Sequence, residues 1–214
     1  MNKTNIEWCD FTLNPVVGCK RNCIYCYARK THNKRHKTYL KGKLQMFPQY
    51  AKPFNEIQFF FDRLLELRRK KTATIFIDSY SDPEYWSDQR LDMILAHVHK
   101  NKQHKIMILT KNPDVYKRVY RWPENMWLGL TVTGEFINDD IENLYKMADN
   151  CYYNNTFISV EPIMGPFKSD SFLPFDQVIV GAMTKPETIK PRSDWLESIR
   201  HPNIFWKDNI KKYL

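Results

Sequence analysis

From residue 18 to residue 27 the chain reads Gly-Cys-Lys-Arg-Asn-Cys-Ile-Tyr-Cys-Tyr. Three of the five cysteines, Cys19, Cys23 and Cys26, therefore stand within eight residues at the spacing C-x3-C-x2-C. Thiolates at this spacing can curl round a cube of iron and sulfide. Because three thiolates leave one iron without a protein ligand, that iron can bind a substrate or cofactor. The stretch predicts a loop that holds a [4Fe-4S] cluster.

The same spacing has a second interpretation, a structural zinc site. Zinc prefers four ligands, and His32 or His36 could supply the fourth. Zinc sites usually combine paired C-x2-C units, so the iron cluster is favoured. Cys9 and Cys151 lie outside the motif and are interpreted as small buried residues. A disulfide framework would spread the cysteines along the chain, so their crowding indicates a reducing, cytoplasmic setting.

Outward from this loop, short apolar runs alternate with helical patterns. Most of the runs are continuous and rich in β-branched residues, which is typical of strands buried on both faces. About six repeats of strand and helix predict a parallel sheet with right-handed crossovers. The expected strands are Leu13–Gly18, Thr74–Asp78, Lys105–Thr110, Met126–Val132, Thr156–Glu161, Gln177–Gly181 and a short Asn203–Trp206.

The helical patterns lie between these runs. Apolar residues recur at helical spacing within residues 57–65, 91–98, 115–120 and 141–148. Asp88, Asn112 and Ser193 are predicted to cap helices, and Pro113 fits the first helical position after Asn112. The segment Pro162–Phe175 is expected to be a loop.

The predicted fold class is α/β, a single domain over residues 1–214, with a partial (β/α)6-type TIM barrel as the leading architecture. A doubly wound open sheet is the alternative, because periodicity cannot separate the two. In either case the site should lie at the carboxyl ends of the strands. No apolar run approaches the roughly 20 residues that span a bilayer, and the N-terminus carries no signal-peptide pattern. We therefore expect no membrane partner.

Positive charge is concentrated around the cysteines. The net charge is +9, yet residues 11–55 contain ten Lys or Arg and no Asp or Glu, and the remainder of the chain is nearly neutral. Such a segment predicts contact with a polyanion or a phosphorylated substrate, and a solvated surface is the plainer interpretation. The residues assigned to nucleic-acid binding are Arg29, Lys30, Lys34, Arg35 and Lys37.

Tyr25 stands directly before the third cysteine of the motif. With this aromatic residue, the motif resembles the signature of the radical S-adenosylmethionine superfamily. The resemblance implies that the free iron chelates S-adenosylmethionine, and that an electron, from a reductant such as flavodoxin or ferredoxin, cleaves it to a 5′-deoxyadenosyl radical. It also implies that Tyr25 contacts the adenine. The amino group of the cofactor would be bound after the second strand, by Ser79, Ser81 or Asp82.

Polar residues after the later strands complete the candidate site. Lys111 is expected to pair with the methionine carboxylate or a substrate phosphate. Thr131 and Thr133 are expected to contact the ribose. Glu161 ends an apolar strand and would be costly to bury unpaired, so we expect it to bind substrate or cofactor.

A narrower resemblance runs along the whole chain. The opening Ile6-Glu7-Trp8-Cys9-Asp10, and later blocks such as residues 77–82, 109–113 and 159–162, are similar to a phage-encoded family of unknown function. That family usually has a glycine-rich acidic turn where this chain reads Ala182-Met183-Thr184-Lys185-Pro186-Glu187. The resemblance implies fold and cofactor, but no substrate.

Three functional hypotheses follow. The first is a radical S-adenosylmethionine enzyme that acts on a nucleic acid, a nucleotide or another anionic substrate. The second is a nucleic-acid-binding module that holds a cluster or a zinc ion without radical chemistry. The third is a subunit that needs a partner chain to complete its site. Cleavage of S-adenosylmethionine separates the first from the others.

Overall fold

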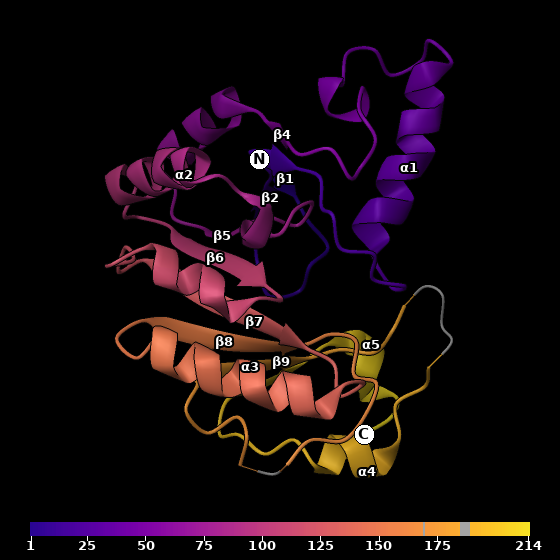
Figure 1. Ribbon diagram of the computed structural model, residues 1–214, viewed down its shortest axis with the longest axis vertical. Helices are drawn as coiled ribbons and strands as arrows, with labels where there is room; N and C mark the ends of the chain where they lie inside the picture. Colours follow the sequence, from indigo (N-terminus) through magenta and orange to yellow (C-terminus); the bar gives the residue numbers. More distant parts are fainter. Residues whose placement is uncertain (169, 185–188) are drawn as a thin grey trace.

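The structure, a computed structural model, describes residues 1–168, 170–184 and 189–214. An eight-stranded sheet runs through it in the order β1-β2-β5-β6-β7-β8-β9-β10 (Figure 1). Strands β3 (Val16–Val17) and β4 (Gln58–Phe59) pair separately and antiparallel. The strands of the main sheet are β1 (Asn2–Lys3), β2 (Phe11–Leu13), β5 (Thr74–Ile77), β6 (Lys105–Thr110), β7 (Met126–Val132), β8 (Asn155–Val160), β9 (Gln177–Val180) and β10 (Ile204–Trp206).

The sheet is mostly parallel. Only the β1–β2 pair is antiparallel, and from β2 to β10 each strand lies beside the next sheet strand of the chain. A doubly wound sheet requires a reversal of strand order, which this order does not contain. The structure therefore has a mixed α/β fold whose carboxyl strand ends gather along one edge.

Helices connect the strands. The α-helices are α1 (Tyr27–Leu40), α2 (Asp88–Lys100), α3 (Ile137–Asn150), α4 (Ser193–Glu197) and α5 (Asp208–Lys211). Shorter 3-10 segments are η1 (Pro48–Tyr50), η2 (Phe61–Arg68), η3 (Pro83–Tyr85) and η4 (Pro113–Arg118). The expected loop over residues 162–175 contains no helix or strand among its described residues.

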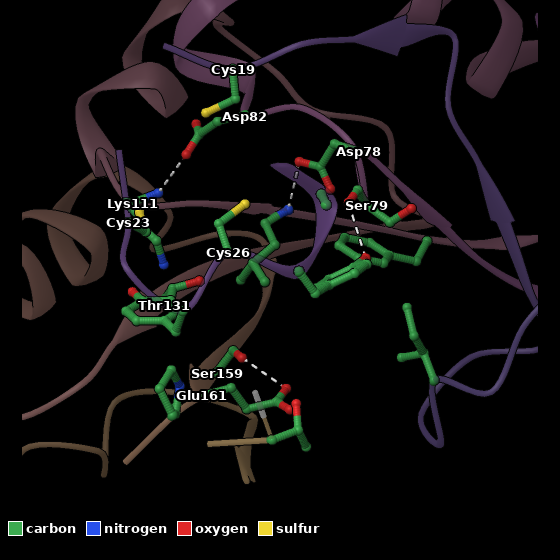
Figure 2. A pocket seen from close by; sticks show the side chains of 18 of the residues that line it. Cys19, Cys23, Cys26, Asp78, Ser79, Asp82, Lys111, Thr131, Ser159 and Glu161 are labelled. Atoms are coloured by element: carbon green, nitrogen blue, oxygen red, sulfur yellow. Dashed lines mark hydrogen bonds between the residues drawn. The ribbon is translucent and has the colours of Figure 1, made fainter. Parts of the chain in front are cut away.

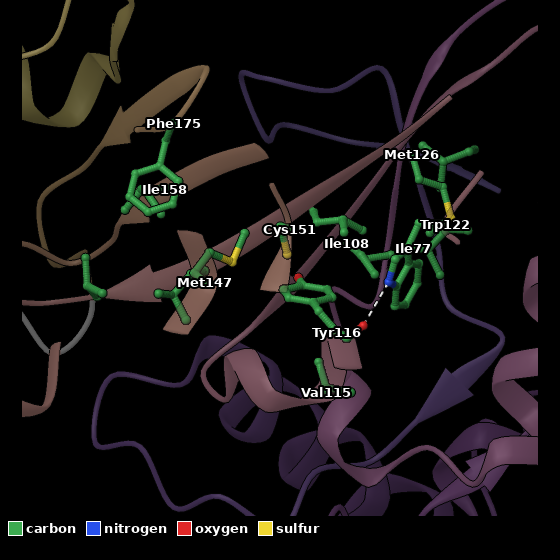
Figure 3. Packing of buried hydrophobic residues seen from close by; sticks show 14 of the residues in the cluster. Ile77, Ile108, Val115, Tyr116, Trp122, Met126, Met147, Cys151, Ile158 and Phe175 are labelled. Carbon is green, nitrogen blue, oxygen red and sulfur yellow. Dashed lines mark hydrogen bonds between the residues drawn. The ribbon is translucent and has the colours of Figure 1, made fainter. Parts of the chain in front are cut away.

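Alternate residues of each strand point to opposite faces of the sheet. Ile75 and Ile77 of β5 belong to the large core cluster, whose packing includes Tyr116 and Cys151 (Figure 3). Phe76, between them, belongs to a second cluster with Met107, Phe157 and Ile179, and the N-terminal residues Ile6, Trp8 and Cys9 pack against that cluster. Burial on both faces explains why the strands read as continuous apolar runs.

Two expected elements are different in the structure. The strand predicted over Leu13–Gly18 is divided at Asn14 and Pro15, and only its start lies in the main sheet. Proline has no N–H to donate to a ladder, and the Asn14 side chain accepts hydrogen bonds from Ser79 Oγ and Tyr80 N instead. The helix predicted over residues 57–65 is strand β4 followed by η2.

The predicted helix starts hold with small shifts. Asn112 caps η4 through a hydrogen bond from Asp114 N, and Pro113 is the first residue of that segment, which is a 3-10 helix. Helix α2 is capped by Ser87 rather than Asp88, and α4 begins at Ser193, so Arg192 is its cap. Helix α1 was not predicted, because its sequence has no apolar stripe.

Candidate functional site

A cavity of about 270 Å³ opens at the carboxyl ends of the parallel strands (Figure 2). The cysteines approach it from one side, and Ser159 and Glu161 lie across it (Figure 2). Thr133 is buried outside the cavity lining. The residues of the predicted cluster and cofactor site that line it are Cys19, Cys23, Tyr25, Cys26, Ser79, Ser81, Asp82, Lys111, Thr131 and Glu161.

The cysteine loop is fixed at its start by Gly18. Gly18 has φ of +116°, and a Cβ there would lie 2.5 Å from the Glu56 carbonyl oxygen, so this position requires glycine. Gly18 N–H donates to Tyr80 O, and Cys19 N–H donates to Phe54 O. These bonds hold the loop against the segments after β5 and before β4.

At the end of the loop, Cys26 is the N-cap of α1. Its sulfur accepts a hydrogen bond from Arg29 N at 3.3 Å, and the Arg29 guanidinium donates to Cys19 O. The Cys26 sulfur therefore lies at the positive end of the helix macrodipole. Burial raises the pKa of the Cys19 thiol to about 12.

The donor set fits an iron–sulfur cluster better than zinc. All three cysteines are free thiols, half-buried on one cavity, and thiolates are the ligands such clusters use. As placed, no group of three or more His, Cys, Asp or Glu among the described residues would hold a metal ion. His32 and His36 bond instead to the carbonyl oxygens of Lys52 and Tyr50 and do not line the cavity.

Asp78 lines the cavity and was not assigned a role from sequence. Its backbone has φ of +103°, its side chain is buried, and Oδ2 accepts from Leu109 N at 3.2 Å. Its Oδ1 atom has no hydrogen-bond partner. Burial, with repulsion from Asp82, raises the pKa of Asp78 well above 3.8. A strained, buried and half-satisfied carboxyl group on a cavity is typical of a ligand-binding position.

Asp82 is fully engaged by its neighbours. Its carboxylate accepts from Thr110 Oγ1, from Lys111 N and from Glu84 N, and Arg21 lies 3.9 Å away. The sequence assigned Asp82 to the cofactor, and the structure gives it a structural set of bonds in addition to a place on the cavity wall. Ser81 Oγ similarly accepts from Trp86 Nε1.

Lys111 is a half-buried cation beside the cysteines. Its Nζ lies 5.3 Å from the centre of the Tyr25 ring, and burial lowers its pKa. Burial also raises the pKa of the Tyr25 hydroxyl. A buried amine favours an anionic neighbour, such as a carboxylate, a phosphate or a thiolate.

Across the cavity, Glu161 forms a polar cluster with two partners. Lys207 Nζ donates to Glu161 Oε1 at 2.5 Å, and Ser159 Oγ donates to Oε2 at 3.1 Å. This ion pair joins the ends of β8 and β10. Glu161 is thus paired within the chain, by a lysine that was not recognised from sequence, and its binding of substrate or cofactor stays a prediction.

The assigned basic residues lie on α1, and its first turn borders the cavity. Arg29 and Arg35 make local contacts, with Cys19 O and with the Tyr50 hydroxyl. Lys30, Lys34 and Lys37 are exposed. The structure thus places these basic residues on the helix that follows the cysteine loop.

The fold is similar to that of spore photoproduct lyase. One solved structure, a variant with dinucleoside spore photoproduct, matches with a TM-score of 0.54 and 12% identity, and a second variant matches with 0.51 and 12%. Each match covers 87% of this chain and 60% of the lyase, so this chain spans less than two thirds of that protein. The chain belongs to the family described as "Protein of unknown function (DUF5131)", whose model matches residues 3–204. No curated protein matches.

Proposed function

We propose that this chain is a radical S-adenosylmethionine enzyme that acts on a nucleic acid, a nucleotide or another anionic substrate. The observation that carries the proposal is the convergence of three free cysteines, at C-x3-C-x2-C spacing, on one cavity at the carboxyl strand ends. The fold supports it, because spore photoproduct lyase is a radical S-adenosylmethionine enzyme. A partial barrel, as in that superfamily, is the architecture we propose for the sheet.

The chain's own residues suit the parts of the cofactor. Cys19, Cys23 and Cys26 would hold a [4Fe-4S] cluster, which when bound supplies the electron that cleaves S-adenosylmethionine. The unpartnered Oδ1 of Asp78 is an acceptor for the amino group of the cofactor. Lys111 offers a cation for its carboxylate, and Tyr25 a ring face for the adenine.

The far wall suits the substrate. Glu161, Ser159 and Lys207 present both charges across from the cysteines, and Lys207 would pair with a phosphate if Glu161 released it. The structural neighbour was solved with a dinucleoside, which supports a nucleotide-containing substrate. A reductant such as flavodoxin or ferredoxin would supply the electron. The proposal also allows a partner subunit to bind at the open cavity.

The cluster assignment is tested by anaerobic reconstitution of five variants. Changing Cys19, Cys23 or Cys26 to Ala should remove most bound iron and sulfide and the absorbance near 400 nm. Cys9→Ala and Cys151→Ala are the matched controls and should retain most of both, because neither residue lines the cavity. Full iron content in Cys23→Ala would contradict the assignment.

The enzymatic assignment needs a separate measurement. With a strong reductant, the reconstituted wild-type protein should form 5′-deoxyadenosine slowly without substrate, and Tyr25→Ala should weaken cofactor binding while leaving iron in place. If the protein holds its cluster but neither binds nor cleaves S-adenosylmethionine, the radical-enzyme proposal fails and the nucleic-acid-binding module replaces it.

A further inference from the structure

Helix α1 is 14 residues long but buries only two of them, Ala28 and His32. These two residues are four apart, so they form a single narrow contact line. The rest of the helix surface is solvent-facing or half-buried. A helix that buries so little apolar surface gains little free energy from packing on the core. Most side chains of α1 are therefore available to a binding partner.

Its exposed surface carries a stripe of lysines. Lys34, Lys37 and Lys41, at and beyond the middle of the helix, are all exposed and stand three and four residues apart. Like charges at these separations repel each other and destabilise a helix. No Asp or Glu occurs between residues 11 and 55 to relieve them. An anion bound along this stripe would remove the repulsion.

The helix that carries the stripe begins at the cavity and leads away from it. Tyr27 and Ala28, in the first turn of α1, line the cavity, and the helix extends from the cysteine loop outward (Figure 1). At 1.5 Å per residue, α1 is about 21 Å long. A stacked strand has one phosphate per 3.4 Å, so this length matches about six phosphates.

We propose that α1, with Lys41 and Lys43 beyond it, binds the phosphate backbone of a single-stranded nucleic acid and leads one nucleotide into the cavity. A single strand is favoured over a duplex. The cavity at the carboxyl strand ends is only about 270 Å³, so a base would have to leave its stack to enter it. Tyr27, a residue that is 51% exposed at the junction with its hydroxyl bonded to Ser79 O, offers a stacking surface for the neighbouring base. Binding of the strand along α1 does not depend on the proposed function. The reaction of a nucleotide inside the cavity does rest on it.

The test compares two triple variants of equal charge change. One carries Lys34→Glu, Lys37→Glu and Lys41→Glu. The control carries Lys70→Glu, Lys71→Glu and Lys102→Glu, exposed residues that precede β5 and β6 at the opposite end of the sheet. Fluorescence anisotropy would measure binding of labelled single-stranded RNA, single-stranded DNA and duplex DNA at two salt concentrations, and circular dichroism would check that the helix content is kept.

We expect wild type and control to bind single strands in preference to duplex, with affinity that falls as salt rises, by a log–log slope of about −0.7 per phosphate contact. The α1 variant should bind at least tenfold more weakly at low salt, with a slope shallower by about 2, because three contacts are lost. A variant with Gln at the same three positions should fall between, which separates lost charge from a misfolded helix.

Equal binding by the α1 variant and the control, or preferred binding of duplex, would overturn the proposal. The two proposals fail separately in wild type. Cleavage of S-adenosylmethionine without measurable oligonucleotide binding removes the α1 proposal alone, and a small phosphorylated molecule then becomes the substrate class. Oligonucleotide binding without cleavage removes the radical-enzyme proposal and leaves the α1 surface.

Discussion

Asp78 combines three uncommon properties in one residue: a positive φ, complete burial and a carboxyl oxygen without a partner. Each of them is unfavourable without a ligand, because strain and an unsatisfied buried polar atom both cost free energy. The backbone conformation is tolerated because aspartate is among the residues that can adopt positive φ. Asp78 therefore lowers the stability of the ligand-free protein. A cationic or hydrogen-bond-donating ligand in the cavity would restore that stability.

Asp78→Asn should stabilise the ligand-free protein by roughly 1–3 kcal/mol at neutral pH. Asparagine keeps an oxygen for Leu109 N and removes the buried charge beside Asp82. Since the folded-state pKa of Asp78 is raised, its ionisation disfavours folding as pH rises above about 3.8 toward that raised value. The stability difference between variant and wild type should be present at pH 7 and should disappear below about pH 4.

Chemical denaturation at several pH values would measure this difference. Asp88→Asn is a suitable control, because its carboxylate is exposed and bonded to Arg118 on the surface. An Asp78→Asn protein that is less stable than wild type at pH 7 would contradict the account of a buried carboxylate whose charge lowers stability.

Sequence reasoning could reach part of this site at the residue scale. Tyr25 was found because it lies inside the cysteine motif, and Lys111 and Glu161 because each follows an apolar strand; all three line the cavity. Asp78 was passed over because a positive φ and a missing partner are properties of the folded backbone. Thr133 was assigned because it ends a strand, yet it lies outside the cavity lining, since the side to which a residue points beyond a strand end cannot be read from alternation.

At the scale of elements, η4 is attached to the central strand β7 through one hydroxyl. Tyr116 Oη donates to Gly129 O at 2.7 Å and accepts from Gly129 N at 3.0 Å. Gly129 has no side chain because a Cβ there would lie 2.3 Å from the Phe157 ring. The buried tyrosine thus satisfies both backbone groups of a glycine that the packing of β8 requires (Figure 3 shows Tyr116 in the core).

Tyr116→Phe should lower the free energy of unfolding by about 1–3 kcal/mol, because it leaves a buried N–H and C=O without this partner. Tyr120→Phe is the matched control, since that hydroxyl is on a fully exposed side chain, and it should change stability by less than about 0.5 kcal/mol. Urea denaturation would measure both. Equal stability of Tyr116→Phe and wild type would show that water or a shift of η4 replaces the bond.

The elements that the sequence predicted well are those with both faces buried. Strands β6 and β7 match the expected ranges to the residue. A strand of a parallel sheet is buried on both faces, so its whole length reads as one continuous apolar run. Helix α1 was missed because it owes its place to two buried residues and a sulfur cap, and neither produces a periodic apolar pattern. The division of the first strand follows from Asn14, whose bonds to residues 79 and 80 join positions 65 and 66 residues apart.

At the scale of the whole molecule, two bodies of unequal packing meet at the cavity. The sheet and its helices share one large core, in which α2 buries Leu91, Ile94 and Val98. Helix α1 buries two residues, Ala28 and His32, and it packs on the segment around η1 instead of on this core. The catalytic cavity that we propose is therefore rigid on its sheet side and more weakly supported on its cysteine side.

Hydrogen exchange should report this difference. In the free protein, the backbone amides of α1 should exchange at least tenfold faster than those of α2, a helix of similar length, because local opening of α1 exposes little apolar surface. Single-stranded RNA should slow exchange in α1 and leave α2 unchanged. Mass spectrometry of the two peptides would measure both rates. Exchange in α1 as slow as in α2 without ligand would contradict the unequal packing.

The sulfur of Cys26 both faces the cavity and caps α1. The hydrogen bond from Arg29 N to that sulfur joins the first turn of the helix to the cavity wall. If a nucleic acid bound along α1 shifts that first turn, the position of the Cys26 sulfur shifts with it, since linked equilibria are reciprocal. One hydrogen bond therefore couples the surface that would receive the strand to the loop that would hold the cluster.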